Sequence, residues 1–255
     1  MKITILGTGT FYVSNIRSGP SYLLEVDDKK ILIDCGPGTL IRLSEVGIKP
    51  EDLDYIFISH FHADHTSDLF ALQMNLRLKE FETEEYKTPI IYGPEGIKEF
   101  TKRLSDVYEL PAFDNYSKIE YREYENLIDL GEIKVKPFKV KHTAFGKEAK
   151  AYALRFECGE KIFVFSGDSV KCEGLEKASV DADLFVCDAS YQKNKANLAH
   201  LDSYQIGEIA QNSKVKKVVL THFYPATSNI DLVAEVKEKY DEEVIMGKDF
   251  MELEV

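Results

Sequence analysis

The run at positions 59–65 constrains this chain more than any other feature. It contains three of the six histidines and one aspartate, in the spacing His60-x-His62-x-Asp64-His65. An apolar, β-prone segment at 56–58 precedes it, and a segment with helical spacing follows it. A strand that ends in such a cluster places imidazoles and a carboxylate on the turn into a helix. These donors suit divalent zinc, manganese or iron.

The spacing predicts two separate roles within the run. His60 and His62 are two positions apart, so in extended backbone their side chains share one side and can bind one ion. Asp64 and His65 follow the turn and can serve a second ion, roughly 3.5–4 Å away as in two-metal hydrolases. Four ligand-type side chains buried without partners would be costly, which disfavours an ordinary packing role.

This motif resembles the signature of the metallo-β-lactamase-fold hydrolases. That family needs three further ligands, each at the end of a strand: a histidine, an aspartate that bridges two metals, and a last histidine. His142, Asp168 and His222 follow apolar or alternating runs at 133–141, 162–165 and 218–220. The resemblance implies one ion held by His60, His62 and His142, a second held by Asp64, His65 and His222, and Asp168 bridging both.

The order of elements fits the same family. Strand-like runs alternate with turns at 1–6, 21–26, 30–34 and 54–59, and strands dominate 119–165. Helical runs are expected at 38–46, 68–81, 94–107, 203–213 and 231–240. The resemblance implies an α/β (α+β) fold, an αββα four-layer sandwich with the metals at one edge. No linker interrupts the chain, and we expect a single domain over 1–255.

Composition excludes several classes of protein. The 255 residues carry 44% hydrophobic side chains, enough for a substantial core. The net charge of −12 argues against broad binding to phosphate backbones. No apolar run is long enough to span a membrane, and the N-terminus reads as a strand rather than a leader, so a cytoplasmic location is the default expectation. None of the four cysteines are in Cys-x-x-Cys spacing, which disfavours a zinc ribbon or redox pair.

Two close divalent ions favour hydrolysis, because they lower the pKa of a shared water toward neutrality and neutralise charge on oxygen. The segments 197–203 and 215–223 resemble ribonuclease Z and its phosphodiesterase relatives. By that similarity, His200 protonates or positions the leaving oxygen, and Asp64 also orients the attacking water. Asp34, in the early aspartate–glycine motif of the same group, and Asp188 are candidates to accept the outer N–H of a ligand histidine.

One departure from ribonuclease Z concerns the substrate. Those enzymes carry a glycine- and proline-rich arm that grips transfer RNA, and the interval 143–167 holds little beyond a hairpin. With the acidic charge, this favours a small or cyclic phosphodiester over nucleic acid. The aromatic side chains between Tyr108 and Tyr124 are either a wall that stacks on a base or ordinary packing, and packing is favoured.

Alternatives remain. The same scaffold also supports transfer-RNA 3′ processing or hydrolysis of carboxylic esters, thioesters or lactones. A β-lactamase is disfavoured because Asp168 stands where such enzymes usually have a cysteine. A metal-binding protein without catalysis is disfavoured because the full ligand set is present. Zinc is the favoured ion, with manganese or iron as alternatives. The sequence is compatible with a homo-oligomer.

Overall fold

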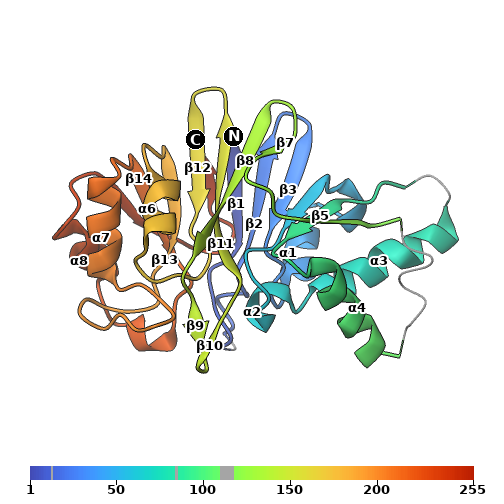
Figure 1. The fold of residues 1–255 in the computed structure, drawn as a ribbon, viewed down its shortest axis with the longest axis horizontal. Coiled ribbons are helices and arrows are strands. Elements are labelled where there is room, and N and C mark those ends of the chain that lie inside the picture. Colours follow the sequence, from blue (N-terminus) through green and yellow to red (C-terminus); the bar gives the residue numbers. More distant parts are fainter. Residues whose placement is uncertain (13, 84–85, 110–117) are drawn as a thin grey trace.

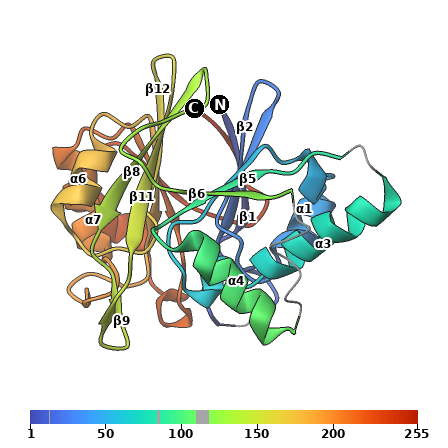
Figure 2. The ribbon, with the colours of Figure 1, turned by 45° about the vertical axis from the view of Figure 1, so that its right-hand side comes forward.

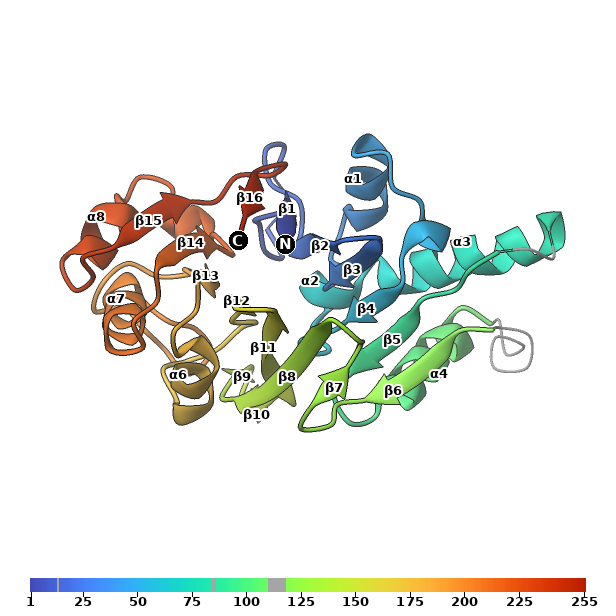
Figure 3. The same ribbon diagram turned by 90° about the horizontal axis from the view of Figure 1, so that it is seen from above.

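Two seven-stranded sheets lie face to face at the centre of the molecule, and helices cover the outer face of each (Figure 1; seen from above in Figure 3). The structure is a computed structural model, and it describes residues 1–255 except 13, 84–85 and 110–117. The predicted αββα sandwich is confirmed. None of the helices within the described ranges is long and apolar enough to cross a membrane.

The first sheet begins as an antiparallel meander and continues as parallel strands. Its order is β16 (Glu252–Glu254), β1 (Lys2–Gly7), β2 (Ser21–Val26), β3 (Lys29–Ile33), β4 (Tyr55–Phe57), β5 (Ile90–Gly93) and β6 (Glu120–Glu123). From β3 to β6 the neighbouring strands are parallel. Its outer face carries α1 (Thr39–Glu45), α3 (Leu69–Glu82) and α4 (Ile97–Val107), which Figure 2 brings forward.

The second sheet mirrors this plan. Its order is β15 (Glu243–Met246), β14 (Lys217–Thr221), β13 (Leu184–Asp188), β12 (Lys161–Phe165), β11 (Ala151–Cys158), β8 (Ile133–Val140) and β7 (Ile128–Asp129). β12 to β15 are parallel, and β11 is antiparallel to both β8 and β12, so β8 and β12 end at the same edge. Helices α6 (Glu173–Ser179), α7 (Ser203–Asn212) and α8 (Leu232–Lys237) cover it.

Short elements connect these layers: η1 (Pro50–Asp52), α2 (Ala63–Thr66), the hairpin of β9 (Thr143–Ala144) and β10 (Lys147–Glu148), and η2 (Pro225–Thr227). Three apolar clusters correspond to the three interfaces of the sandwich. The central one joins side chains such as Tyr22 and Phe57 of the first sheet to Phe156 and Phe163 of the second. The outer two pack each sheet against its helices.

Most predicted elements occur within a few residues of the expected positions, and the exceptions have local causes. The strand expected over 54–59 ends at Phe57, since the Ser59 N–H donates to the Asp34 carboxylate instead of a neighbouring strand. The helix expected over 231–240 ends at Lys237, whose ammonium donates to the carbonyls of Asp241 and Glu242.

The aromatic segment serves packing where it is described. The Tyr124 hydroxyl donates to the Ile58 carbonyl at 2.7 Å, and its ring stacks on Phe57. Tyr108 stacks on Phe70. Phe113 and Tyr116 lie outside the described residues.

Candidate metal centre

The carboxyl ends of strands from both sheets meet at one edge of the sandwich, and this edge carries the predicted ligands. The turn after β4 leads to His60 and His62, and α2 begins directly after His62, so Asp64 and His65 lie on its first turns. His142, Asp168 and His222 follow β8, β12 and β14. The structure therefore brings together all seven side chains that the sequence analysis named.

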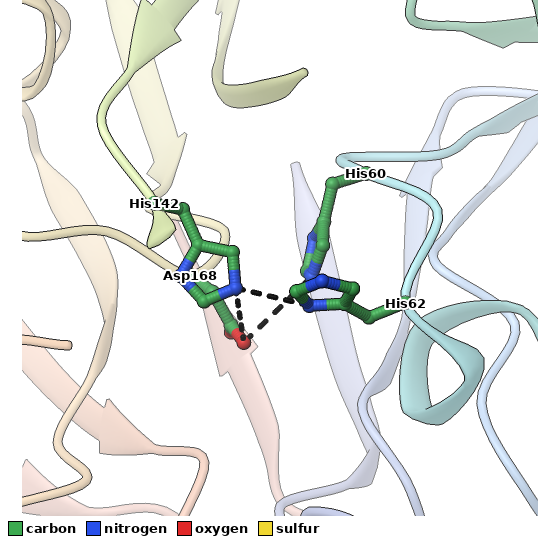
Figure 4. Close-up of side chains that lie close together, drawn as sticks. All are labelled: His60, His62, His142 and Asp168. Atoms are coloured by element: carbon green, nitrogen blue, oxygen red, sulfur yellow. Dashed lines mark hydrogen bonds and ion pairs between the residues drawn. The ribbon is translucent and has the colours of Figure 1, made fainter. Parts of the chain in front are cut away.

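Four of them form a first group, His60, His62, His142 and Asp168 (Figure 4). His62 Nδ1 lies 3.0 Å from His142 Nε2. Asp168 Oδ2 lies 3.8 Å from both His60 Nε2 and His142 Nε2. The three imidazoles and the carboxylate thus point toward one centre.

Asp64, His65 and His222 form a second group, and Asp168 belongs to it as well. Asp168 Oδ1 lies 3.2 Å from His65 Nε2 and 3.4 Å from His222 Nε2. Asp64 Oδ2 lies 3.7 Å and 3.3 Å from the same two nitrogens. Asp168 therefore turns one carboxylate oxygen toward each group, which is the arrangement of a bridging ligand.

These distances fit metal coordination. Donor atoms about 2.0–2.1 Å from a tetrahedral centre lie roughly 3.3 Å from one another. Four side-chain atoms among the described residues are buried without a hydrogen-bond partner: His60 Nε2, His65 Nε2 and Asp64 Oδ1 at this edge, and Gln73 Oε1 on α3. Buried polar atoms are normally paired, and three of these four belong to the two groups. The residues present fit two divalent ions.

A third group, Asp168, Asp188, His200 and His222, meets the same geometric criterion but differs in chemistry. His200 Nδ1 already donates to Asp188 Oδ2 at 2.8 Å. His222 Nδ1 lies 3.0 Å from the Ser190 hydroxyl. Because these nitrogens have partners, the cluster is better suited to orienting side chains than to holding an ion.

Asp34 orients two histidines on the first-sheet side. Its Oδ2 accepts from His65 Nδ1 at 2.7 Å and from the Ser59 hydroxyl at 2.8 Å. The Ser59 oxygen in turn lies 3.0 Å from His60 Nδ1, which donates to it. Both imidazoles therefore carry their proton on Nδ1 and present a lone pair on Nε2 to the centre.

Asp188 repeats this arrangement on the second-sheet side. It accepts directly from His200, and from the hydroxyl of Ser190, whose oxygen accepts from His222 Nδ1. The sequence analysis named Asp34 and Asp188 for this role but missed Ser59 and Ser190. The signal that could have indicated them is their position in the chain, since Ser59 directly precedes His60 and Ser190 lies two residues after Asp188.

Backbone geometry at this edge is constrained. Asp34 and His222 have φ values of 57° and 58°, in the left-handed region that non-glycine residues rarely adopt. A Cβ on Gly36 would lie 2.1 Å from the Asp64 carbonyl oxygen, so the chain passes closely here. Such strain is typical of functional sites.

The electrostatics differ between the two groups. Burial lowers the pKa of His60 well below its usual value, and lowers that of His62. Burial acts the same way on His65 and His222, but the carboxylates, Asp168 foremost, outweigh it and raise the pKa of His222 to about 10 and that of His65 well above normal. A group that attracts protons this strongly also attracts other cations, and metal binding there releases protons.

The centre opens into a cavity of about 410 Å³. His62, Asp64, Asp168 and His200 lie on it, and His200 Nε2 is 3.4 Å from the Tyr224 hydroxyl. His142 Nδ1 donates to the Ala199 carbonyl at 2.7 Å, which ties the loop before His200 to the centre.

The sandwich has the metallo-β-lactamase fold, and sequence relatives named as hydrolases make the chain with this histidine–aspartate edge a metal-dependent hydrolase. A family model described as anti-Pycsar protein Apyc1 matches residues 1–240, and the chain belongs to that family.

Relatives agree with this assignment. The chain is 26% identical over 312 positions to ribonuclease Z of Methanosarcina acetivorans, covering 100% of this chain and 98% of that protein. It is 27% identical over 253 residues to the probable metallo-hydrolase YhfI of Bacillus subtilis, covering 97% of each. The resemblance to ribonuclease Z-like hydrolases is therefore confirmed.

Solved structures share the fold. The crystal structure of YhfI from Bacillus subtilis has a TM-score of 0.83 at 24% identity and covers 100% of this chain and 99% of that one. Human tRNase Z, short form, has a TM-score of 0.76 at 22% identity with the same coverage.

Proposed function

We propose that this chain is a dinuclear metal phosphodiesterase, a single domain that acts on a small or cyclic phosphodiester. Zinc is the ion we propose for both positions, with manganese or iron as alternatives set by supply. His60, His62 and His142 would hold one ion, Asp64, His65 and His222 the other, and Asp168 would bridge them. We propose a cytoplasmic location for the enzyme.

The observation that carries this proposal is the split of the Asp168 carboxylate. Oδ2 faces two imidazole nitrogens of the first group at 3.8 Å, and Oδ1 faces two of the second at 3.2 Å and 3.4 Å. The buried, unpaired nitrogens face different oxygens of it, His60 Nε2 facing Oδ2 and His65 Nε2 facing Oδ1. One carboxylate with two sets of nitrogen donors supports two ions better than one.

The chain's own residues would then have distinct roles. Bound ions supply activated water and neutralise charge on the phosphoryl oxygens. Asp64, buried on the first turn of α2, would orient the attacking water. His200 has its Nδ1 fixed by Asp188, so its Nε2 faces the cavity and can donate a proton to the leaving oxygen.

Three observations favour a small substrate. The cavity of about 410 Å³ suits a small organic molecule. The alignment with the Methanosarcina ribonuclease Z runs over 312 positions although this chain has 255 residues, so that relative carries segments absent here. A net charge of −12 also disfavours a polyanion.

Transfer-RNA 3′ processing is the second candidate, because several curated relatives are named ribonuclease Z. It predicts cleavage of a precursor transfer RNA with steep salt dependence.

A panel of substrates on metal-reconstituted enzyme separates these functions. We expect turnover of bis-p-nitrophenyl phosphate and of at least one 2′,3′- or 3′,5′-cyclic phosphodiester, and none of nitrocefin. Asp168→Ala should abolish turnover and lower the bound metal. Ester hydrolysis without phosphodiester hydrolysis would refute the proposal, and precursor cleavage without small-diester cleavage would favour the second candidate.

A further inference from the structure

The tip of the β9–β10 hairpin carries a bulky aromatic side chain, Phe145, that does not stabilise the free protein. Ala144 pairs with Lys147, so Phe145 and Gly146 form a two-residue loop, with φ values of 52° and 75°. Such loops favour Asn, Asp or Gly, and a bulky residue at the first position is disfavoured. The Phe145 side chain is also 100% exposed, so no packing offsets this strain.

The tip of this hairpin lies on the rim of the catalytic cavity. Phe145 lines the same cavity as His62, Asp64 and His200. The hairpin projects from one end of the molecule (Figures 1 and 2). Its base is held to the loop before α7, because Thr143 N–H donates to the Leu198 carbonyl at 3.0 Å.

Two further apolar side chains are exposed on the same rim. Leu198 is 76% exposed and Phe11 is 52% exposed, and both line the cavity. They come from the loops before α7 and after β1, so three separate loops each present an apolar side chain at one opening. Imidazoles and carboxylates form the floor of the cavity, so the site has a polar floor and an apolar rim.

We infer that Phe145, supported by Leu198 and Phe11, is a specificity-determining contact that stacks on a flat ring carried by the substrate's ester group. The inference rests on the proposed function, since the phosphoryl group must occupy the polar floor. A flat ring fits because stacking on an aromatic side chain needs only a π-face and little directed hydrogen bonding. Exposed apolar side chains around one opening are typical of a ligand-binding groove.

Equilibrium binding tests this directly. The probes are thymidine 5′-monophosphate and 1,2-dideoxyribose 5-phosphate, in which a hydrogen replaces the base, titrated calorimetrically into zinc-loaded protein. The native protein should bind the nucleotide roughly tenfold more tightly than the sugar phosphate, the scale of one base stacked on one aromatic side chain. Phe145→Asn should abolish that preference and leave sugar-phosphate binding unchanged, whereas Phe145→Tyr should retain it.

The Asn variant carries a second readout. Asn suits the left-handed turn position, so Phe145→Asn should raise the melting temperature while removing the preference. If Phe145 were only structural, Phe145→Asn would lower the melting temperature and keep the binding preference. Phe81→Ala, a similarly exposed aromatic (75%) on α3 that does not line this cavity, is the matched control and should keep the preference.

The outcomes are distinguishable. If neither probe binds and no diester is cleaved, the proposed function fails and this inference fails with it. If diesters are cleaved but the native protein binds both probes equally, only the role of Phe145 is refuted. A Phe145→Asn variant that keeps the tenfold preference, or that only dissociates a dimer, would refute it as well.

Discussion

Replacement of Asp34 by asparagine tests the hydrogen bonds that orient His60 and His65 without removing any proposed metal ligand. Asp34 accepts three hydrogen bonds, from the Ser59 N–H at 2.7 Å, the Ser59 hydroxyl at 2.8 Å and His65 Nδ1 at 2.7 Å. In Asp34→Asn, the amide oxygen can still accept the hydrogen bond from the Ser59 N–H. The amide NH₂ then occupies the position of the other carboxylate oxygen and faces His65. His65 must then move its proton to Nε2, the atom that faces Asp168, and it can no longer act as a ligand there.

The expected magnitude follows from these contacts. Loss of such an orienting partner typically weakens metal affinity about 10–100-fold, or about 1.4–2.7 kcal/mol. The effect should fall on the second group more than on the first, because His65 contacts Asp34 directly whereas His60 does so only through Ser59. Ser59→Ala should therefore weaken the first ion, and by less.

Isothermal titration of the metal-free protein with zinc measures both affinities. Asp231→Asn is the matched control, since Asp231 caps α8 by accepting from Ala234 N–H, and asparagine caps a helix equally well. If folded Asp34→Asn bound two zinc ions with native affinity, the assignment of this network would be wrong.

Three other predictions test separate parts of the account. His200→Gln should lower kcat on a phosphodiester roughly 10²–10⁴-fold with unchanged metal content by elemental analysis, and equal activity would refute a catalytic role. Burial raises the pKa of Glu157, but hydrogen bonds and ion pairs with Lys136 and Arg155 outweigh burial and hold this pKa below its usual value. The ionised carboxylate therefore stabilises the fold at a pH above its unfolded pKa. This stabilisation is lost as the pH falls through the folded pKa. Glu157→Gln should therefore lower the free energy of unfolding by roughly 0.5–1 kcal/mol at pH 7 and by nothing measurable in acid near pH 2, and a constant difference in urea denaturation would contradict this. Gly174→Ala should destabilise by about 1–3 kcal/mol, because its Cβ would lie 1.8 Å from the Lys139 carbonyl oxygen, and an unchanged urea midpoint would show that the backbone can relax there.

The candidate ligand set could be named from the sequence because the His-x-His-x-Asp-His run resembles a family motif, and His142, Asp168 and His222 follow strands in the order that this resemblance implies. Strands such as β12 and β14 are apolar runs whose ends are marked by Gly167 and Thr221, and the ligands follow within three residues. Parallel packing then brings those ends to one edge. The family motif together with the strand order was thus enough to propose a site built from distant parts of the chain.

The orienting hydroxyls and the hairpin tip could not be found in this way. Ser59 and Ser190 are ordinary serines in sequence, and their role depends on carboxylates that reach them through the folded chain. Phe145 is distinguished by its backbone angle and exposure, which only the structure provides. β16 was also missed, because its pairing with β1 depends on a partner at the other end of the chain.

Anomalous diffraction from a zinc-soaked crystal at the metal edge tests the central claim most directly. We expect two peaks roughly 3.5–4 Å apart, one among His60, His62 and His142 and one among Asp64, His65 and His222, with Asp168 between them. A single peak, or a peak among Asp188, His200 and His222 instead, would contradict it.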